Sequence, residues 1–109
     1  MAKDDYFVIM YLFLKRLYAL LKSGKTITND EIDEFGQSYN QDYWEYILIN
    51  LAKEGYIEGA VEAKTLGGGS VAYKDVKITP SGIEYLFSNS MMERVKNTLK
   101  DIKGIVPGF

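Results

Sequence analysis

Residues 40–55 read NQDYWEYILINLAKEG, and this stretch decides the fold. Ser38, three residues before Gln41, fits a capping box at the start of a helix, and Gly55 fits the left-handed position after its last turn. At the helical period, one side of the stretch carries Trp44, Ile47, Leu48, Leu51 and Ala52. The pattern predicts an amphipathic helix that packs this side against the core.

The opposite face of this helix is expected to point outward. It carries Asp42, Tyr43, Tyr46, Ile49, Asn50 and Lys53. Because aromatic side chains are enriched in protein interfaces, we take this face, apart from the lysine, as a candidate contact for a protein partner. The alternative is that Tyr43 and Tyr46 are ordinary half-buried tyrosines, since single apolar residues are common on protein surfaces.

Residues 5–22 predict a long hydrophobic first helix, with apolar residues on nearly its whole circumference. The apolar run between Asp5 and Lys15 is nine residues long, which is too short to span a bilayer, so we expect no membrane association. We expect the core on one side of this helix and a second cover on the other, either the C-terminal helix or another subunit. The interface candidates on this helix are Val8, Ile9 and Leu12.

A short helix and a hairpin flank the central helix. Thr28 and Glu31 have capping-box spacing, and Gly36 ends the short helix. Residues 56–63 and 71–78 partly alternate in polarity and predict two strands joined by a loop over residues 65–70. The Gly67-Gly68-Gly69 run lacks the Gly-Lys-Ser/Thr of a phosphate-binding loop, so we expect a hairpin tip there and no nucleotide site.

Two further helices complete the chain. Thr79 is the expected cap of the first, with Pro80 at its first position. Its apolar face is expected to consist of Ile83, Leu86 and Phe87. Ser90 and Glu93 predict the start of the last helix. Its apolar side is expected to consist of Met91, Val95, Leu99 and Ile102. We expect residues 103–109 to form a frayed tail.

The order helix, helix, hairpin, with one more helix in front, is that of a winged helix-turn-helix. We therefore expect an α+β fold: a winged helix-turn-helix with a long hydrophobic N-terminal helix, a two- or three-stranded β-wing and one or two C-terminal helices. The length of 109 residues fits a single domain over residues 1–109.

Two phrases carry a family resemblance. LAKEGYI at residues 51–57 and ITPSGIEYL at residues 78–86 are similar to the third-helix exit and the post-wing helix of many winged-helix proteins. With the hydrophobic first helix and VKNTLKDIK at residues 95–103, the chain resembles the YjcQ family, small proteins of Firmicutes and their phages. The resemblance implies a winged-helix fold and a phage or prophage setting, and it carries over no activity and no functional residue.

Composition excludes the commonest catalytic and metal-binding chemistries. The chain has no histidine and no cysteine, which removes Ser-His-Asp triads, Cys-His pairs and the usual zinc sites. We therefore expect no catalysis, no metal, no cofactor and no small-molecule substrate. The lack of cysteine fits a reducing, cytoplasmic setting.

Charge separates the two hypotheses for function. The interval from Thr26 to Ala52 holds six acidic residues and no lysine or arginine, a charge of −6, whereas DNA affinity rests mainly on lysine and arginine at phosphates. We therefore expect a regulatory or protein–protein interaction module, whose partner is another protein or a second copy of the chain.

The alternative is a DNA-binding transcriptional regulator that docks through the wing and the basic C-terminal helix. Its phosphate contacts would come from Lys64, Lys74, Lys77, Arg94, Lys96, Lys100 and Lys103. In that docking, base edges would be contacted by Asn40, Gln41 and Asn50.

Overall fold

The structure is a computed structural model that describes residues 5–65 and 68–101, with side-chain surroundings for residues 5–63 and 71–100. Within these ranges the chain forms five helices and one antiparallel hairpin, so the α+β class is confirmed. The elements are α1 (Asp5–Lys22), α2 (Asn29–Gly36), α3 (Gln41–Lys53), β1 (Ile57–Thr65), β2 (Gly68–Ile78), α4 (Pro80–Ser88) and α5 (Ser90–Asp101).

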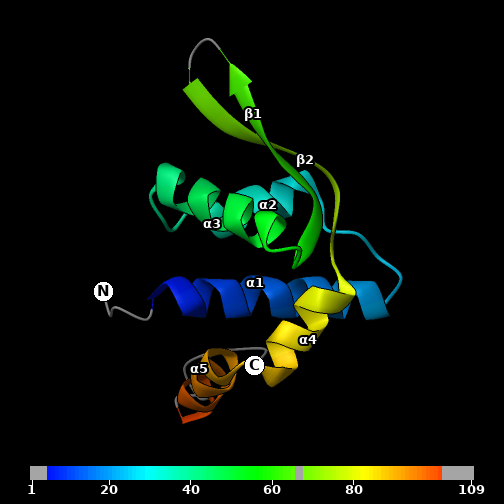
Figure 1. Ribbon diagram of the computed structural model, residues 1–109, viewed down its shortest axis with the longest axis vertical. Helices are drawn as coiled ribbons and strands as arrows, with labels where there is room; N and C mark the ends of the chain where they lie inside the picture. Colours follow the sequence, from blue (N-terminus) through cyan, green and yellow to red (C-terminus); the bar gives the residue numbers. More distant parts are fainter. Residues whose placement is uncertain (1–4, 66–67, 102–109) are drawn as a thin grey trace.

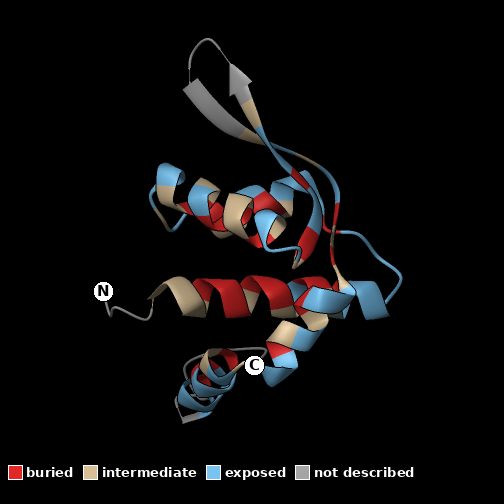
Figure 2. Ribbon diagram, in the orientation of Figure 1, coloured by how far each residue is buried: buried red, intermediate tan, exposed pale blue. Residues whose placement is uncertain are grey.

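Helix α1 lies in the middle of the molecule. In Figure 1 it runs between α2 and α3 on one side and α4 and α5 on the other, with the hairpin extending beyond α2 and α3. Figure 2 shows buried residues along most of its length. The second cover of α1 is therefore provided by the C-terminal helices of the same chain, which pack against it. Of the helices in the described ranges, none is long and apolar enough to cross a membrane.

Trp44 of α3 occupies the centre of the core, with 2% of its surface exposed. Its ring meets Phe13 of α1 edge-on at 5.3 Å and stacks with Phe35 of α2 at 6.1 Å between centroids. A Cβ atom at Gly36 would lie 2.4 Å from the indole Cδ1, so any larger residue there would displace the ring. Gly36 ends α2 as expected, and its lack of a side chain lets α3 approach.

Three of the expected helix boundaries are confirmed. The Thr28 hydroxyl accepts a hydrogen bond from the Glu31 amide at 3.1 Å, and Thr79 caps α4 with Pro80 at its start. Gly55, after α3, has φ +80°. The amides of Gly55 and Tyr56 donate hydrogen bonds to the carbonyl oxygens of Ala52 and Leu51 in the last turn of the helix. The left-handed conformation explains glycine at this position.

Two of the expected caps are wrong. The side chain of Asn40, and not that of Ser38, accepts hydrogen bonds from the first amides of α3, at 2.9 and 3.2 Å. Likewise Asn89 caps α5 at 2.8 and 3.2 Å, and Ser90 is already helical. In both places a serine has the spacing of a capping box. An asparagine, which caps helices at least as well as serine, lies directly before the first helical residue and takes the position instead.

The apolar faces of the last two helices also differ from expectation. Phe87 is 60% exposed, whereas Leu86 is buried and Ile83 is half-buried. In α5 the buried methionine is Met92, and Met91 is half-buried. Met92 precedes the buried Val95 and Leu99 by three and seven residues, the spacing of one helical face. Ile102 and residues 103–109 lie outside the described residues.

The hairpin is longer than expected, because the expected loop over residues 65–70 contains paired residues as far as Thr65 opposite Gly68. A bulge interrupts the ladder near the core, where Glu58 pairs with Lys77 but Ala60 pairs with Tyr73. Gly59 at the bulge has φ +90°, and a Cβ atom there would lie 2.5 Å from the Lys74 carbonyl oxygen. The sheet has two strands within the described residues, in line with the expectation of two or three.

The cap assignment predicts different effects for two neighbouring substitutions. Asn40→Ala should lower the free energy of unfolding by about 1 kcal/mol, because it leaves two amides of α3 without their acceptor. Ser38→Ala removes a hydroxyl from the exposed turn and should change it by less than about 0.5 kcal/mol. Urea unfolding followed by circular dichroism measures both. A larger loss in the serine variant would contradict the assignment.

Candidate protein-interaction surface

Tyrosines from three helices and from the turn after α3 gather at one side of α3. We call Tyr6, Tyr43, Tyr46, Tyr56 and Tyr85 the tyrosine surface. The Tyr6 ring of α1 lies 6.4 Å from that of Tyr43 and 6.3 Å, edge-on, from that of Tyr46. Tyr56, after α3, stacks on Tyr85 of α4 at 4.3 Å. Burial raises the pKa of Tyr85, and the nearby Tyr56, Tyr6 and Glu54 raise it further, so the two groups lie near each other.

Negatively charged side chains lie near the hydroxyls of Tyr6 and Tyr43. Burial raises the pKa of Tyr6, and the nearby Tyr46, Tyr43 and Glu54 raise it further. For Tyr43 the pKa is raised by burial and then by Asp5 and Tyr39. The hydroxyls of Tyr6 and Tyr43 therefore stay protonated at neutral pH. They provide hydrogen-bond donors on apolar rings, next to carboxylates.

The interface candidates on α3 lie on this side of the molecule. Tyr46 is 57% exposed, Asp42 is exposed, and Tyr43, Ile49 and Asn50 are half-buried. Tyr43 is thus half-buried, as the alternative interpretation expects, whereas Tyr46 is exposed. A partner could reach the Tyr46 ring directly.

The candidates on α1 lie elsewhere. Ile9 is 1% exposed and belongs to the core. Val8 and Leu12 are half-buried and pack against that core. Because α4 and α5 supply the second cover of α1, these residues offer little surface to a partner.

Sequence reasoning missed Tyr6, Tyr56 and Tyr85 as members of the surface. The chain contains nine tyrosines, which is an available signal. Which tyrosines meet depends on how α1 and α4 pack against α3, and the periodicity of a single helix carries no information on that.

The nucleic-acid candidates fall into two separate groups. Lys74 is exposed and Lys77 half-buried on β2, whereas Arg94, Lys96 and Lys100 are exposed on α5. The hairpin and α5 lie at opposite ends of the molecule (Figure 1), so the fold does not gather the two groups on one face. The side chain of Lys64 and all of Lys103 lie outside the described residues.

The three expected base-contacting side chains have partners within the protein. Asn40 caps α3 through its side-chain oxygen. The Gln41 amide donates to Glu45 at 2.9 Å, and the Asn50 amide donates to the Tyr46 carbonyl oxygen at 2.8 Å. Contact with a base edge would have to compete with these hydrogen bonds.

A side-chain hydrogen bond links the hairpin to α2. The Tyr73 hydroxyl of β2 donates to Asp33 Oδ1 of α2 at 2.6 Å. Burial, together with this bond and the charges of Asp33 and Glu45, raises the pKa of Tyr73 to about 12. The contact holds the middle of the hairpin against α2.

No group of three or more acidic residues that could hold a metal ion is present among the described residues. Among known proteins, the family described as "YjcQ protein" matches residues 11–105, and the chain belongs to this family. Neither a curated protein nor a solved structure matches the chain.

The Tyr73–Asp33 contact predicts a specific pH dependence of stability. Near neutral pH, Tyr73→Phe should lower the free energy of unfolding by about 0.5–1 kcal/mol through loss of one hydrogen bond. In the unfolded chain Tyr73 loses its proton near its ordinary pKa of 10.0, but in the folded protein only near 12. The folded state therefore binds more protons in this window, and this contribution to stability falls as pH rises.

Urea unfolding of both proteins from about pH 8 to about pH 11 tests this dependence. The other tyrosines titrate alike in the two proteins, so the difference between them isolates Tyr73. It should be constant below about pH 9 and shrink above pH 10. A difference that grows with pH would contradict the assignment.

Proposed function

We propose that this member of the YjcQ family is a non-catalytic interaction module on a winged helix-turn-helix scaffold, which binds a partner protein through the tyrosine surface. The observation that carries the proposal is Tyr46, a large aromatic side chain that is 57% exposed beside Tyr6 and Tyr43. Exposed, clustered aromatic residues are the usual energetic centres of protein interfaces. A regulatory role in a phage or prophage setting, inside the cytoplasm, is part of this proposal.

The scaffold assignment rests on the order and placement of α2, α3 and the hairpin. A short helix leads by a turn into a longer one, and a two-stranded hairpin follows directly. In DNA-binding proteins of this architecture, the outer face of the second helix of the pair enters the major groove. Here that face contributes Tyr43 and Tyr46 to the tyrosine surface. We therefore propose that the same face binds a partner, and that this partner is a protein and not DNA.

The charge at the rim of the surface indicates the chemistry of the partner. Asp42 lies one turn before Tyr46 on α3, Asp5 acts on the Tyr43 hydroxyl, and Glu54 acts on that of Tyr6. Two copies joined through the same surface would bring these carboxylates together. We therefore propose a different protein, with lysine or arginine around an apolar contact.

Electrostatics favour a protein partner over DNA. The helix pair that would face the groove carries an excess of acidic residues, and the basic residues of β2 and α5 lie at opposite ends of the molecule. A duplex laid on α3 would be repelled at its phosphates.

Site-specific photo-cross-linking tests the proposed surface. A photoreactive phenylalanine analogue at position 46 should give a discrete covalent adduct with one protein in the cells that produce the chain. The additional substitution Tyr6→Ala should reduce the yield of this adduct severalfold. Position 87 is the matched control, because Phe87 has nearly the same exposure (60% against 57%) on α4. Equal adducts at both positions, or none at position 46, would refute the proposal.

A salt titration of duplex DNA binding tests the competing function. By fluorescence anisotropy at about 50 mM salt, where phosphate contacts are strongest, we expect no binding that weakens with added salt. A steep salt dependence, reduced by both Lys74→Ala and Lys100→Ala, would instead establish docking through the wing and α5.

A further inference from the structure

A depression of about 410 Å³ lies where the turn after α3 meets one face of α4, and we call it the glutamate cleft. Four of the residues that line it belong to α4 and have the spacing of a single helical face. These four are Ser81, Glu84, Tyr85 and Ser88, and the turn contributes Glu54 and Tyr56. Because Tyr56 and Tyr85 belong to the tyrosine surface, the cleft is continuous with that surface.

Backbone contacts hold α4 against the turn. The Thr79 amide donates a hydrogen bond to the Tyr56 carbonyl oxygen at 3.0 Å, and the Thr79 hydroxyl donates to the Gly55 carbonyl oxygen. A Cβ atom at Gly82 would lie 2.1 Å from the Tyr56 carbonyl oxygen, so the approach of α4 requires glycine at this position. The shape of the glutamate cleft is therefore fixed before a ligand arrives, which reduces the cost of binding.

Two stacked tyrosine rings line the glutamate cleft. The ring planes of Tyr56 and Tyr85 are inclined by 22°, and their centroids are 4.3 Å apart. Both side chains are half-buried, which leaves part of each accessible. The face of an aromatic ring carries partial negative charge and attracts a cation. The rings therefore favour a positively charged ligand.

Two carboxylates accompany these rings. Glu54 and Glu84 are both exposed, and within the described part of the chain neither of them forms an ion pair. Burial is the largest cause of the raised pKa of Tyr85, and the charge of Glu54 also contributes, so Glu54 lies close to the ring pair. Carboxylates beside aromatic rings complement a cation that is able to stack and to donate hydrogen bonds.

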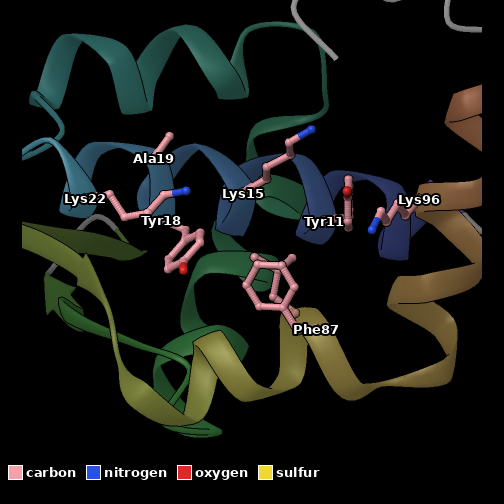
Figure 3. Close-up of a pocket in the computed structure, with 8 residues that line it drawn as sticks. Tyr11, Lys15, Tyr18, Ala19, Lys22, Phe87 and Lys96 are labelled. Atoms are coloured by element: carbon pink, nitrogen blue, oxygen red, sulfur yellow. The ribbon is translucent and has the colours of Figure 1, made fainter.

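Aromatic rings also line a cavity of about 270 Å³ between α1, α4 and α5, but the charged side chains there are lysines. Figure 3 shows Lys15, Lys22 and Lys96 along this cavity, and none of its described lining residues is acidic. Lys15 follows Tyr6 by nine residues, or two and a half helical turns, so this cavity lies on the opposite side of α1 from Tyr6. The sign of the charge beside the rings therefore favours a cation in the glutamate cleft and disfavours one in this cavity.

We propose that the glutamate cleft binds an arginine side chain of the partner protein, with the guanidinium group on the two tyrosine rings and its N–H donors directed to the two glutamates. The inference rests on the proposed function and names the residue type that anchors the partner. A guanidinium group is planar, stacks on aromatic faces and directs several donors to carboxylates at once. The ammonium group of lysine is a compact and more strongly hydrated charge, so it loses more on leaving water.

The test uses the full chain, labelled with ¹⁵N, and N-acetyl-argininamide as the probe, at about 50 mM salt to limit screening. Amide shifts should map to residues 54–56 and 81–89 and spare residues 11–22 of α1, which border the lysine-lined cavity. We expect a dissociation constant of about 1–10 mM, as for a single exposed anchor. The lysine counterpart of the probe should bind about threefold more weakly, and the neutral citrulline counterpart about tenfold more weakly.

Substitutions of exposed glutamates separate the cleft from the net charge of the chain. Glu54→Gln and Glu84→Gln should each weaken binding of the arginine probe about threefold. Glu62→Gln on the hairpin makes the same change in net charge and should leave the affinity within about 1.5-fold. Tyr85→Leu should remove the preference for arginine over lysine, because it removes a stacking ring. Circular dichroism checks the fold of each variant, and the glutamate variants decide the question if Tyr85→Leu does not fold.

The probe needs no partner, so it separates failure of this inference from failure of the proposed function. Three results would overturn the arginine site: no shifts in the cleft at about 20 mM probe, equal binding of the arginine and citrulline probes, and equal weakening by Glu84→Gln and Glu62→Gln. The proposed function would survive all three.

The photo-cross-link at position 46 supplies the second readout. Glu84→Gln should reduce the yield of that adduct severalfold, and an unchanged yield would overturn the role of the cleft while leaving the partner protein in place. A dimer of the chain that Glu84→Gln dissociates would assign the cleft to a second copy and would also overturn the inference. Absence of the adduct would refute the proposed function, whereas shifts with the arginine probe would still establish the cleft as an arginine site.

Discussion

The rest of the structure depends on one contact, the packing of the Trp44 ring against Gly36. The indole ring touches aromatic rings of both α1 and α2 and lies where a Cβ atom at Gly36 would be. It therefore fixes the distance between α2 and α3 and the position of both on α1. With Trp44 pointing inward, the helical period turns Tyr43 and Tyr46 toward the N-terminal end of α1, where Tyr6 meets them.

Helix α1 separates two surfaces of different chemistry. On the side of α3, tyrosine hydroxyls lie among carboxylates, and on the side of α4 and α5, lysines lie among aromatic rings. The small net charge of −2 conceals this division. The division depends on which side chains the packed helices bring together.

Much of the fold could be predicted from sequence, because its signals are local. The bounds of α1 and the buried face of α3 follow from helical periodicity, and the caps at Thr28 and Thr79 from the residues next to them. Errors arose where two local signals competed, as with the asparagine caps, or where a side chain at the edge of an apolar face could be either buried or exposed, as with Phe87.

The candidate surfaces were harder to predict, for a physical reason. Tyr46 was identified because it lies on the outer face of one helix, but its neighbours Tyr6 and Tyr85 come from helices far away in sequence. Lys15, Lys22 and Lys96 line one cavity, and they are likewise divided between α1 and α5. Pairings of this kind are set by tertiary packing, which a single sequence does not encode in any short window.

The central place of α1 also affects how the chain acquires its structure during synthesis. This helix is made before the two helices of its second cover, α4 and α5. Until then its apolar side toward α4 and α5 has no intramolecular partner, and an exposed apolar helix is prone to associate with other chains. Contacts between the ends of a chain also slow folding, since the long intervening loop must close first. The nascent chain is therefore expected to be prone to association until α5 has been made and can pack on α1.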